Sequence, residues 1–177
     1  MRAWKDADVE PLAAALADER VVRYLDHWSR GPYSMSRARQ WVTSATPETV
    51  RVWAIECCDD GALIGSTGLD SIDLQNRRCS WGIWTGPPDR WGRGYGTEAC
   101  MLSVEHAFRT LGLSKVSLSV WAGNDRARRA YEKAGFTSEG VLRRHYLLDG
   151  ALVDVEVMAV FADNPLYVRR IAQVGAD

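Results

Sequence analysis

The segment with the most chemical information is a glycine-rich run, WGRGYGTEA at residues 91–99, which follows a predicted strand and opens a predicted helix. Glycines at alternate positions let the backbone turn tightly and approach a ligand closely. The first N–H groups of the helix have no partner within it, and together with the helix dipole they form an anion site. The run therefore indicates a site that suits pyrophosphate.

Two other phosphate loops fit this run less well. A Walker A loop requires Lys followed by Ser or Thr after its glycines, and neither pair follows here. A dinucleotide fingerprint has the spacing G-x-G-x-x-G within a βαβ unit, and Ser117 or Ser119 stands where its acidic ribose ligand would be expected. For the run taken alone, a plain glycine-rich turn stays open as the alternative.

A second segment, NDRARRAYEKAGF at residues 124–136, places Asn124 at the start of a predicted helix. Tyr131 follows seven residues later, which is two helical turns and nearly the same face. The alternative interpretation is an N-cap with a partly buried tyrosine.

The elements that must position these segments follow from the periodicity of apolar residues. Asp8 can cap a helix, because Val9, Leu12, Ala13 and Leu16 follow at helical spacing. A second helix is predicted over 35–45. The period then changes to strands joined by turns such as Asp59-Asp60-Gly61. The predicted order continues with strands 50–57, 62–72 and 79–85, helix 94–111 ended by Gly112, strand 115–121, helix 124–135, and strands 137–146 and 151–161 joined at Asp149-Gly150.

This order predicts an α+β fold, in which about four helices flank one mixed, mostly antiparallel sheet. Residues 1–163 are expected to form one domain, and residues 164–177 a C-terminal tail. Only residues 1–4 precede the first helix, so any edge strand there is short.

The composition excludes several classes of protein. Apolar residues make up 46% and charged residues 25%, as in a globular domain, and the net charge of −1 gives no basic field for nucleic acid. No apolar run reaches the roughly 18–20 residues of a membrane span, and the first residues lack the apolar part of a signal peptide. The cysteines form no C-x-x-C pair, so free thiols in the cytoplasm are expected rather than a metal site; they are Cys57, Cys58, Cys79 and Cys100.

The two segments together resemble the GNAT superfamily of N-acyltransferases, in the branch of the ribosomal-protein N-terminal and spermidine acetyltransferases. The similarity spans roughly residues 1–161, is strong from Gly82 onward, and continues through the second segment as far as Asp154. Either segment alone is moderate evidence, whereas their joint match is specific.

The resemblance implies a sheet that splays open near its middle, so that the pantetheine arm of acetyl-CoA enters like an extra strand. Backbone groups of Trp84, Thr85 and Gly86 would pair with this arm, and Asn124 would face it. Tyr131 would lie at the sulfur as the proton donor. The pyrophosphate would be held by backbone N–H groups of the loop, from Gly92, Arg93, Gly94, Tyr95, Gly96 and Thr97.

The chemistry of acyl transfer agrees with these roles. An amine attacks a thioester, and a strand N–H can stabilise the tetrahedral oxyanion. The leaving group is a thiolate, to which a tyrosine hydroxyl with a pKa near ~10 can donate a proton. Positioning the two reactants together supplies much of the remaining rate. We therefore expect a cytoplasmic N-acetyltransferase that joins acetyl-CoA and an amine in a ternary complex without a metal.

Two positions depart from the family pattern. Trp91 stands where the superfamily usually has Gln or Arg, which a loop that works through its backbone tolerates. Ser80 stands two residues before Gly82, where the related pattern often has a Glu as base or substrate contact. Serine is no base at neutral pH, so water-mediated bases elsewhere stay open: Asp70, Asp73, Glu139, Asp149 and Asp154.

The sequence leaves several further alternatives open. A GNAT-fold sensor could bind acyl-CoA without turnover, and a transferase could use a longer acyl-CoA. The acceptor could be a protein N-terminus, a polyamine or a small-molecule amine, and its wall should come from residues 28–33 and the hairpin at Asp149. His27 or His145 could line it, whereas His106 is expected to be structural. A homodimer is common in this branch. Three arginines could contact the 3′-phosphate of the cofactor: Arg126, Arg128 and Arg129.

Overall fold

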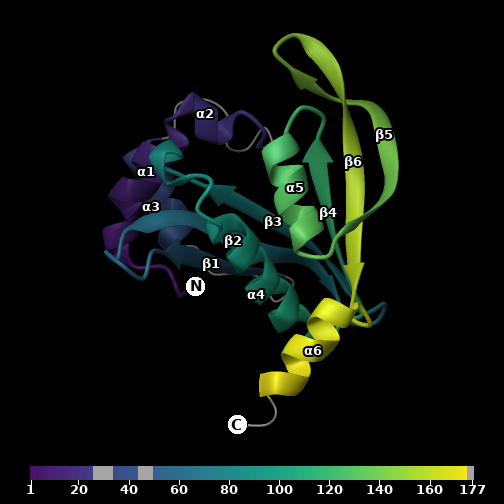
Figure 1. Cartoon of the computed structure of the whole chain (residues 1–177). Coiled ribbons are helices and arrows are strands. Elements are labelled where there is room, and N and C mark those ends of the chain that lie inside the picture. The colour runs from purple at the N-terminus through teal and green to yellow at the C-terminus, as the bar shows by residue number, and fades with distance from the viewer. Residues whose placement is uncertain (26–33, 44–49, 175–177) are drawn as a thin grey trace.

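The computed structural model describes residues 1–25, 34–43 and 50–174, arranged around one six-stranded sheet of order β1-β2-β3-β4-β6-β5 (Figure 1). Adjacent strands pair antiparallel except β3 and β4. The predicted α+β class with a mostly antiparallel sheet is therefore confirmed. The strands are β1 (Arg51–Glu56), β2 (Leu63–Asp73), β3 (Arg78–Thr85), β4 (Lys115–Trp121), β5 (Thr137–Leu148) and β6 (Ala151–Phe161).

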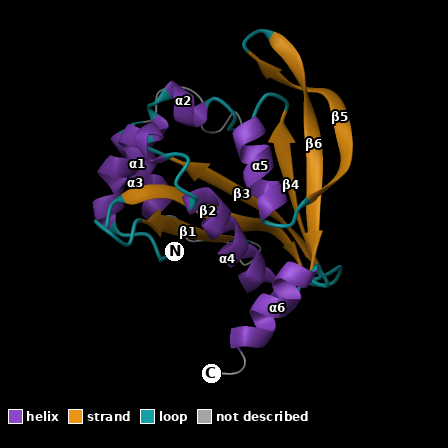
Figure 2. Cartoon of the chain, viewed as in Figure 1, coloured by secondary structure: helices purple, strands orange, loops and turns teal. Residues whose placement is uncertain are grey.

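Helices cover both faces of this sheet (Figure 2). On one face, Trp84 of β3 packs with the apolar side of α1 and with Ala38 of α3. On the other face, Trp81 of β3 packs with Val104 of α4. The α-helices are α1 (Val9–Leu16), α2 (Glu19–Val22), α3 (Met35–Thr43), α4 (Tyr95–Arg109), α5 (Asp125–Lys133) and α6 (Pro165–Val174). Within the described ranges, no helix has the length and apolarity needed to cross a bilayer.

Asp8 does not have the capping role that the sequence predicts. It occupies the N-cap position of α1, but its side chain makes no cap hydrogen bond there. Its carboxylate instead accepts two hydrogen bonds from the Arg2 guanidinium, at 2.7 and 2.8 Å, and one from the N–H of Lys5 at 2.8 Å. Arg2 also forms a single bridge with Ala54, which ties the short N-terminal segment to the edge of the sheet.

The segment predicted as a C-terminal tail contains helix α6, so this prediction is wrong for residues 165–174. Tyr167 of this helix is fully buried, donates a 2.7 Å hydrogen bond to the carbonyl of Ala134, and packs edge to face on Phe108. Arg170 forms an ion pair with Glu105 of α4 at 3.2 Å. Helix α6 is thus part of the core.

Candidate active site

The glycine-rich run forms the loop before α4. Gly92 and Gly94 have φ angles of 79° and 90°, in the left-handed region that side chains disfavour. A Cβ added at either glycine would meet no atom within 4 Å, so the space beside both is open. The first helical bond runs from the N–H of Glu98 to the carbonyl of Gly94, which leaves the N–H groups of residues 95–97 without an intrahelical acceptor. The loop therefore has the geometry of an anion cradle.

Trp91 anchors this loop with its side chain. Its indole Nε1–H donates a 2.8 Å hydrogen bond to the carbonyl of Thr85, at the end of β3. The guanidinium of Arg126 from α5 stacks on its ring at 3.6 Å from the centroid. Burial of Arg126 against the ring lowers the pKa of its guanidinium. An aromatic residue at this position thus joins three elements that surround the open space.

The sheet opens between β3 and β4 (Figure 1). Their register extends only over Arg78–Lys115, Cys79–Val116 and Ser80–Ser117, although both strands continue beyond it. Among the described residues, no strand pairs on this side with the remaining backbone of β3, from Trp81 to Thr85. The splayed sheet expected from the resemblance is therefore present.

Hydrogen bonding shows which β3 residues present backbone groups to this opening. The N–H of Gly86 donates to the carbonyl of Ile64, on the side of β2. Because the direction of N–H and C=O groups alternates along a strand, Trp84 faces β2 as well, whereas Ile83 and Thr85 face the opening. The close approach of β2 agrees with this, since a Cβ on Gly65 would lie 2.3 Å from the Trp84 carbonyl. Trp84 and Gly86 therefore present their backbone groups to β2 and not to the opening, contrary to expectation, whereas Ile83 and Thr85 present theirs to the opening.

Tyr131 lies on α5 beside the same opening, partly buried against Trp81 and Phe136. Burial raises the pKa of its hydroxyl, the nearby Cys100 thiol acts in the same direction, and the positive charge of Arg126 opposes both. Within the described part of the chain, this hydroxyl has no hydrogen-bond partner. It is therefore a protonated phenol available to a ligand.

Asn124 caps α5, as its position in the sequence predicts. Its side-chain oxygen accepts a hydrogen bond from the N–H of Ala127 at 3.4 Å. One side-chain atom is thus engaged in the cap, and the amide N–H groups are left for a ligand.

One cavity of about 820 Å³ joins these features. Every residue predicted for cofactor binding or catalysis lines it, including Trp84 and Gly86. Sequence reasoning missed Ile83, and only the register of the sheet could have identified it. The predicted residues on the cavity wall are Trp84, Thr85, Gly86, Gly92, Arg93, Gly94, Tyr95, Gly96, Thr97, Asn124 and Tyr131.

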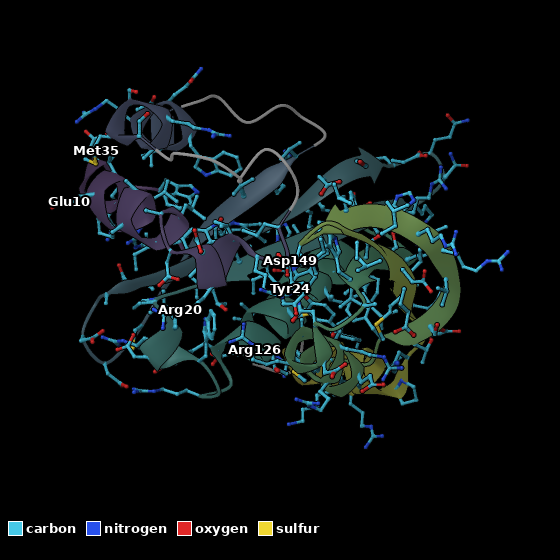
Figure 3. All side chains as sticks on the ribbon, turned by 90° about the horizontal axis from the view of Figure 1, so that it is seen from above. Glu10, Arg20, Tyr24, Met35, Arg126 and Asp149 are labelled. Atoms are coloured by element: carbon cyan, nitrogen blue, oxygen red, sulfur yellow. The ribbon has the colours of Figure 1, made fainter. Side chains whose placement is uncertain are left out.

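Residues near the end of α2 connect the two halves of the split sheet at the mouth of this cavity. Arg23 forms an ion pair with Asp149 of the β5–β6 hairpin at 2.6 Å, and the Tyr24 hydroxyl donates to the Gly123 carbonyl at 3.1 Å. Figure 3 shows Tyr24 and Asp149 together over the middle of the molecule, far from Glu10. Tyr24 and, from β5, Tyr146 line the cavity, so the hairpin lies beside its mouth. Its role as an acceptor wall stays a prediction, and residues 28–33 are outside the described ranges.

The candidate histidines and arginines differ in whether they line the cavity. His106 packs edge to face on Trp53, and burial, with Arg51 and Arg109, lowers its pKa, as expected for a structural residue. His145 is exposed and is not part of the cavity wall, and His27 lies outside the described residues. Of the three candidate arginines, Arg128 pairs with Glu132 and Glu156, whereas Arg126 and Arg129 line the cavity.

Four of the five candidate carboxylates are engaged away from the cavity wall. Asp73 binds Asn76 and Arg78, and Glu139 pairs with Lys115. Asp149 pairs with Arg23, and Asp154 accepts the N–H of Arg144. Among the described residues, the single carboxylate that lines the cavity is Asp70.

Comparison with known proteins assigns this architecture to a family. The acetyltransferase (GNAT) domain matches residues 1–137. The chain is 28% identical over 162 residues to the uncharacterized N-acetyltransferase YoaA of Bacillus subtilis, covering 90% of this chain and 91% of that protein. It is also 28% identical over 153 residues to the spermidine N(1)-acetyltransferase of Escherichia coli K12, covering 81% of each.

A solved structure has the same fold. The spermidine N-acetyltransferase of Vibrio cholerae, crystallised with CoA and spermine, superposes with a TM-score of 0.79 at 23% identity, covering 94% of this chain and 96% of that one. The loop, the split sheet and Tyr131 lie together in a fold that is matched over nearly its whole length. The chain therefore belongs to the GNAT family of acetyltransferases.

Proposed function

We propose that this acetyltransferase joins acetyl-CoA and a primary amine in one ternary complex and transfers the acetyl group by direct attack of the amine. The observation that carries the proposal is the single cavity on which the glycine loop, the opening of the sheet and Tyr131 converge. A pyrophosphate requires an anion cradle, and an amide-bearing arm requires an unpaired strand edge. A departing thiolate requires a proton donor, which a protonated phenol supplies.

The loop and the strand edge hold the donor. The N–H groups of residues 92–97 bind the pyrophosphate, and the open space beside Gly92 and Gly94 admits its oxygens. Backbone groups of Ile83 and Thr85 pair with the pantetheine amides. Arg126 and Arg129, which line the cavity beside the loop, supply positive charge for the phosphates.

Tyr131 donates a proton to the departing thiolate. The attack of the amine forms a C–N bond and a tetrahedral oxyanion, which an N–H of the β3 edge stabilises. Collapse of this intermediate breaks the C–S bond and releases the thiolate of CoA, which takes the Tyr131 proton. The proton that the amine nitrogen loses returns through water to the Tyr131 phenolate, so the step balances. Because burial raises the pKa of Tyr131, its hydroxyl stays protonated at neutral pH, which is the state that a donor requires.

The acceptor is an amine on a protein N-terminus, a polyamine or a small molecule, and it enters from the mouth beside the β5–β6 hairpin. The relatives named as spermidine acetyltransferases support an amine acceptor in general. The four cysteines are free thiols, which supports a cytoplasmic location.

The test is a panel of amines mixed with acetyl-CoA, with detection of released thiol. We expect thiol release that depends on both the amine and the enzyme. CoA binding without thiol release for any amine would identify an acyl-CoA sensor instead. Release only with longer acyl-CoA donors would replace the acetyl group in this proposal.

A further inference from the structure

A row of three polar side chains runs across the sheet at the point where it opens. Asp70 of β2 is paired with Ser80 of β3, and Ser80 is paired with Ser117 of β4. Residues directly opposite each other on neighbouring strands lie on the same face, with Cβ atoms about 4.5–5.5 Å apart. All three residues line the cavity. Asp70 thus places a carboxylate next to Ser80, the position that has lost the family's glutamate.

This row lies on the face from which a second reactant must approach. Side chains alternate along β3, so Ser80 shares a face with Trp84, which packs on α1. Trp81 points to the opposite face, where it contacts Tyr131 and where α4 carries the anion cradle. The donor is held from the α4 face, and Asp70 therefore stands on the acceptor face.

Asp70 has a negative charge that the described protein does not neutralise. Its carboxylate accepts a 2.9 Å hydrogen bond from the Ser71 hydroxyl, and no described cation pairs with it. It is also the only described carboxylate on a cavity wall that carries several cationic side chains. A ligand with two or three ammonium groups would find one anionic partner on the described wall, and its other charges would have none there.

Apolar side chains flank this polar row on the same face. Val52 lies opposite Gly68 in the register, two residues from Asp70 and therefore on the same side of the sheet. Val50, Leu25 and Trp41 line the same cavity. A ligand whose ammonium group reaches Asp70 thus has an apolar wall for the rest of its body.

We propose that Asp70 binds the ammonium group of the acceptor, which then passes a proton to water and attacks as the neutral amine. We propose further that this acceptor has one positive charge and an apolar body, and is not a polyamine. This inference rests on the proposed acetyl transfer. It also assigns to β2 the acidic contact that β3 lacks at Ser80.

The experiment compares hexylamine with 1,6-diaminohexane, which have the same length and differ by one charge. We expect a kcat/KM at least about tenfold higher for hexylamine, because the second ammonium group of the diamine would lie against the apolar wall without an anionic partner. A preference for the diamine, or for spermidine, would overturn the proposal and leave acetyl transfer intact.

Three variants test the residue. Asp70→Asn should raise KM for hexylamine about 10- to 100-fold, with kcat changed less and the CoA dissociation constant unchanged. Asp70→Glu should restore much of this loss. Asp73→Asn is the matched control, because its carboxylate lies on the same strand but is engaged by Asn76 and Arg78, and it should behave like the wild type.

Competitive inhibition by 1-hexanol, which has no charge, separates charge recognition from a change of shape. Its inhibition constant should be equal in the wild type and in Asp70→Asn. An equal weakening of hexanol and hexylamine, or an unchanged KM for hexylamine in Asp70→Asn, would show that Asp70 does not bind the ammonium group. Absence of thiol release with every amine would instead overturn the proposed function, and this inference with it.

Discussion

Trp81 of β3 and Tyr131 of α5 pack edge to face, with ring centroids 5.3 Å apart and planes at 87°. The contact holds the phenol against the strand that borders the opening. The indole N–H of Trp81 is itself buried without a partner among the described residues. The ring of Tyr131 is thus fixed by packing, whereas its hydroxyl is free for a ligand.

Tyr131→Phe keeps this ring contact and removes only the hydroxyl. We expect kcat to fall by ~10²–10⁴ while the CoA dissociation constant stays nearly unchanged. Steady-state kinetics with calorimetry checks both values. Wild-type turnover in this variant would assign proton donation to water.

Gly94→Val tests the anion cradle. Valine resists the φ of 90° at this position, and its side chain would occupy the open space where the pyrophosphate is expected. We expect CoA affinity to fall much more than the stability of the apo protein, as measured by calorimetry and thermal unfolding. If the variant binds CoA normally, the loop is only a turn.

CoA should stabilise the folded chain. At 100 times its dissociation constant, a ligand that binds only the native state contributes ~2.7 kcal/mol. For a domain of this size, that corresponds to a rise in Tm of roughly 5–11 °C. A melting curve that millimolar acetyl-CoA does not move would contradict the assignment of the cavity.

The pH dependence of kcat/KM should follow the acceptor. Ser80 provides no carboxylate, so the amine must reach its neutral form largely by its own ionisation. Plots of kcat/KM against pH should then rise up to about pH 10 for alkylamines and up to about pH 8 for α-amines, the values of their own pKa. A limb near neutral pH that is the same for both, and that disappears in the amide variant of one candidate carboxylate, would reveal a protein base.

The Arg2–Asp8 pair should contribute to stability in a pH-dependent way. Burial opposes the charge of Asp8, but hydrogen bonds from Arg2 and Lys5 prevail and lower its pKa. A lowered pKa stabilises the native state above the unfolded value of about 3.9, and this contribution is lost as the pH falls through the folded value.

Arg2→Ala should therefore cost roughly 2–4 kcal/mol at neutral pH, because it leaves a buried carboxylate without its main partner. The difference from the wild type should shrink as the pH falls toward 3, as urea unfolding would show. Arg20→Ala is the control, since its pair with Asp18 is at the surface. Equal losses in the two variants at every pH would contradict this role of Asp8.

Local patterns were sufficient to predict most of the sheet. Strands β4 and β6 begin and end where alternation and turn residues indicate, because those signals are contained in the strands themselves. Helix α2 was missed, since four residues show no helical period. Helix α6 falls within the predicted tail, although Pro165 suits the first position of a helix.

The candidate site was predictable as a set of residues but not as an arrangement. Glycine spacing and the Asn124–Tyr131 interval identified residues that the structure brings to one cavity, and their roles stay predictions. The assignment of Trp84 and Gly86 rather than Ile83 to the open edge failed, because the direction of a backbone group depends on pairing with β2. The position of Asp70 beside Ser80 depends equally on a register between two strands.

The two halves of the split sheet are linked at both ends, by contacts of different strength. They are joined at one end by three residue pairs of β3 and β4, and near the other end by the contacts of Arg23 and Tyr24. Both side chains in the Arg23–Asp149 pair are largely exposed, so water competes with that link. The distance between the two halves is therefore held firmly at the β3–β4 pairs and weakly at the mouth, where an exposed ion pair and one hydrogen bond are the links described.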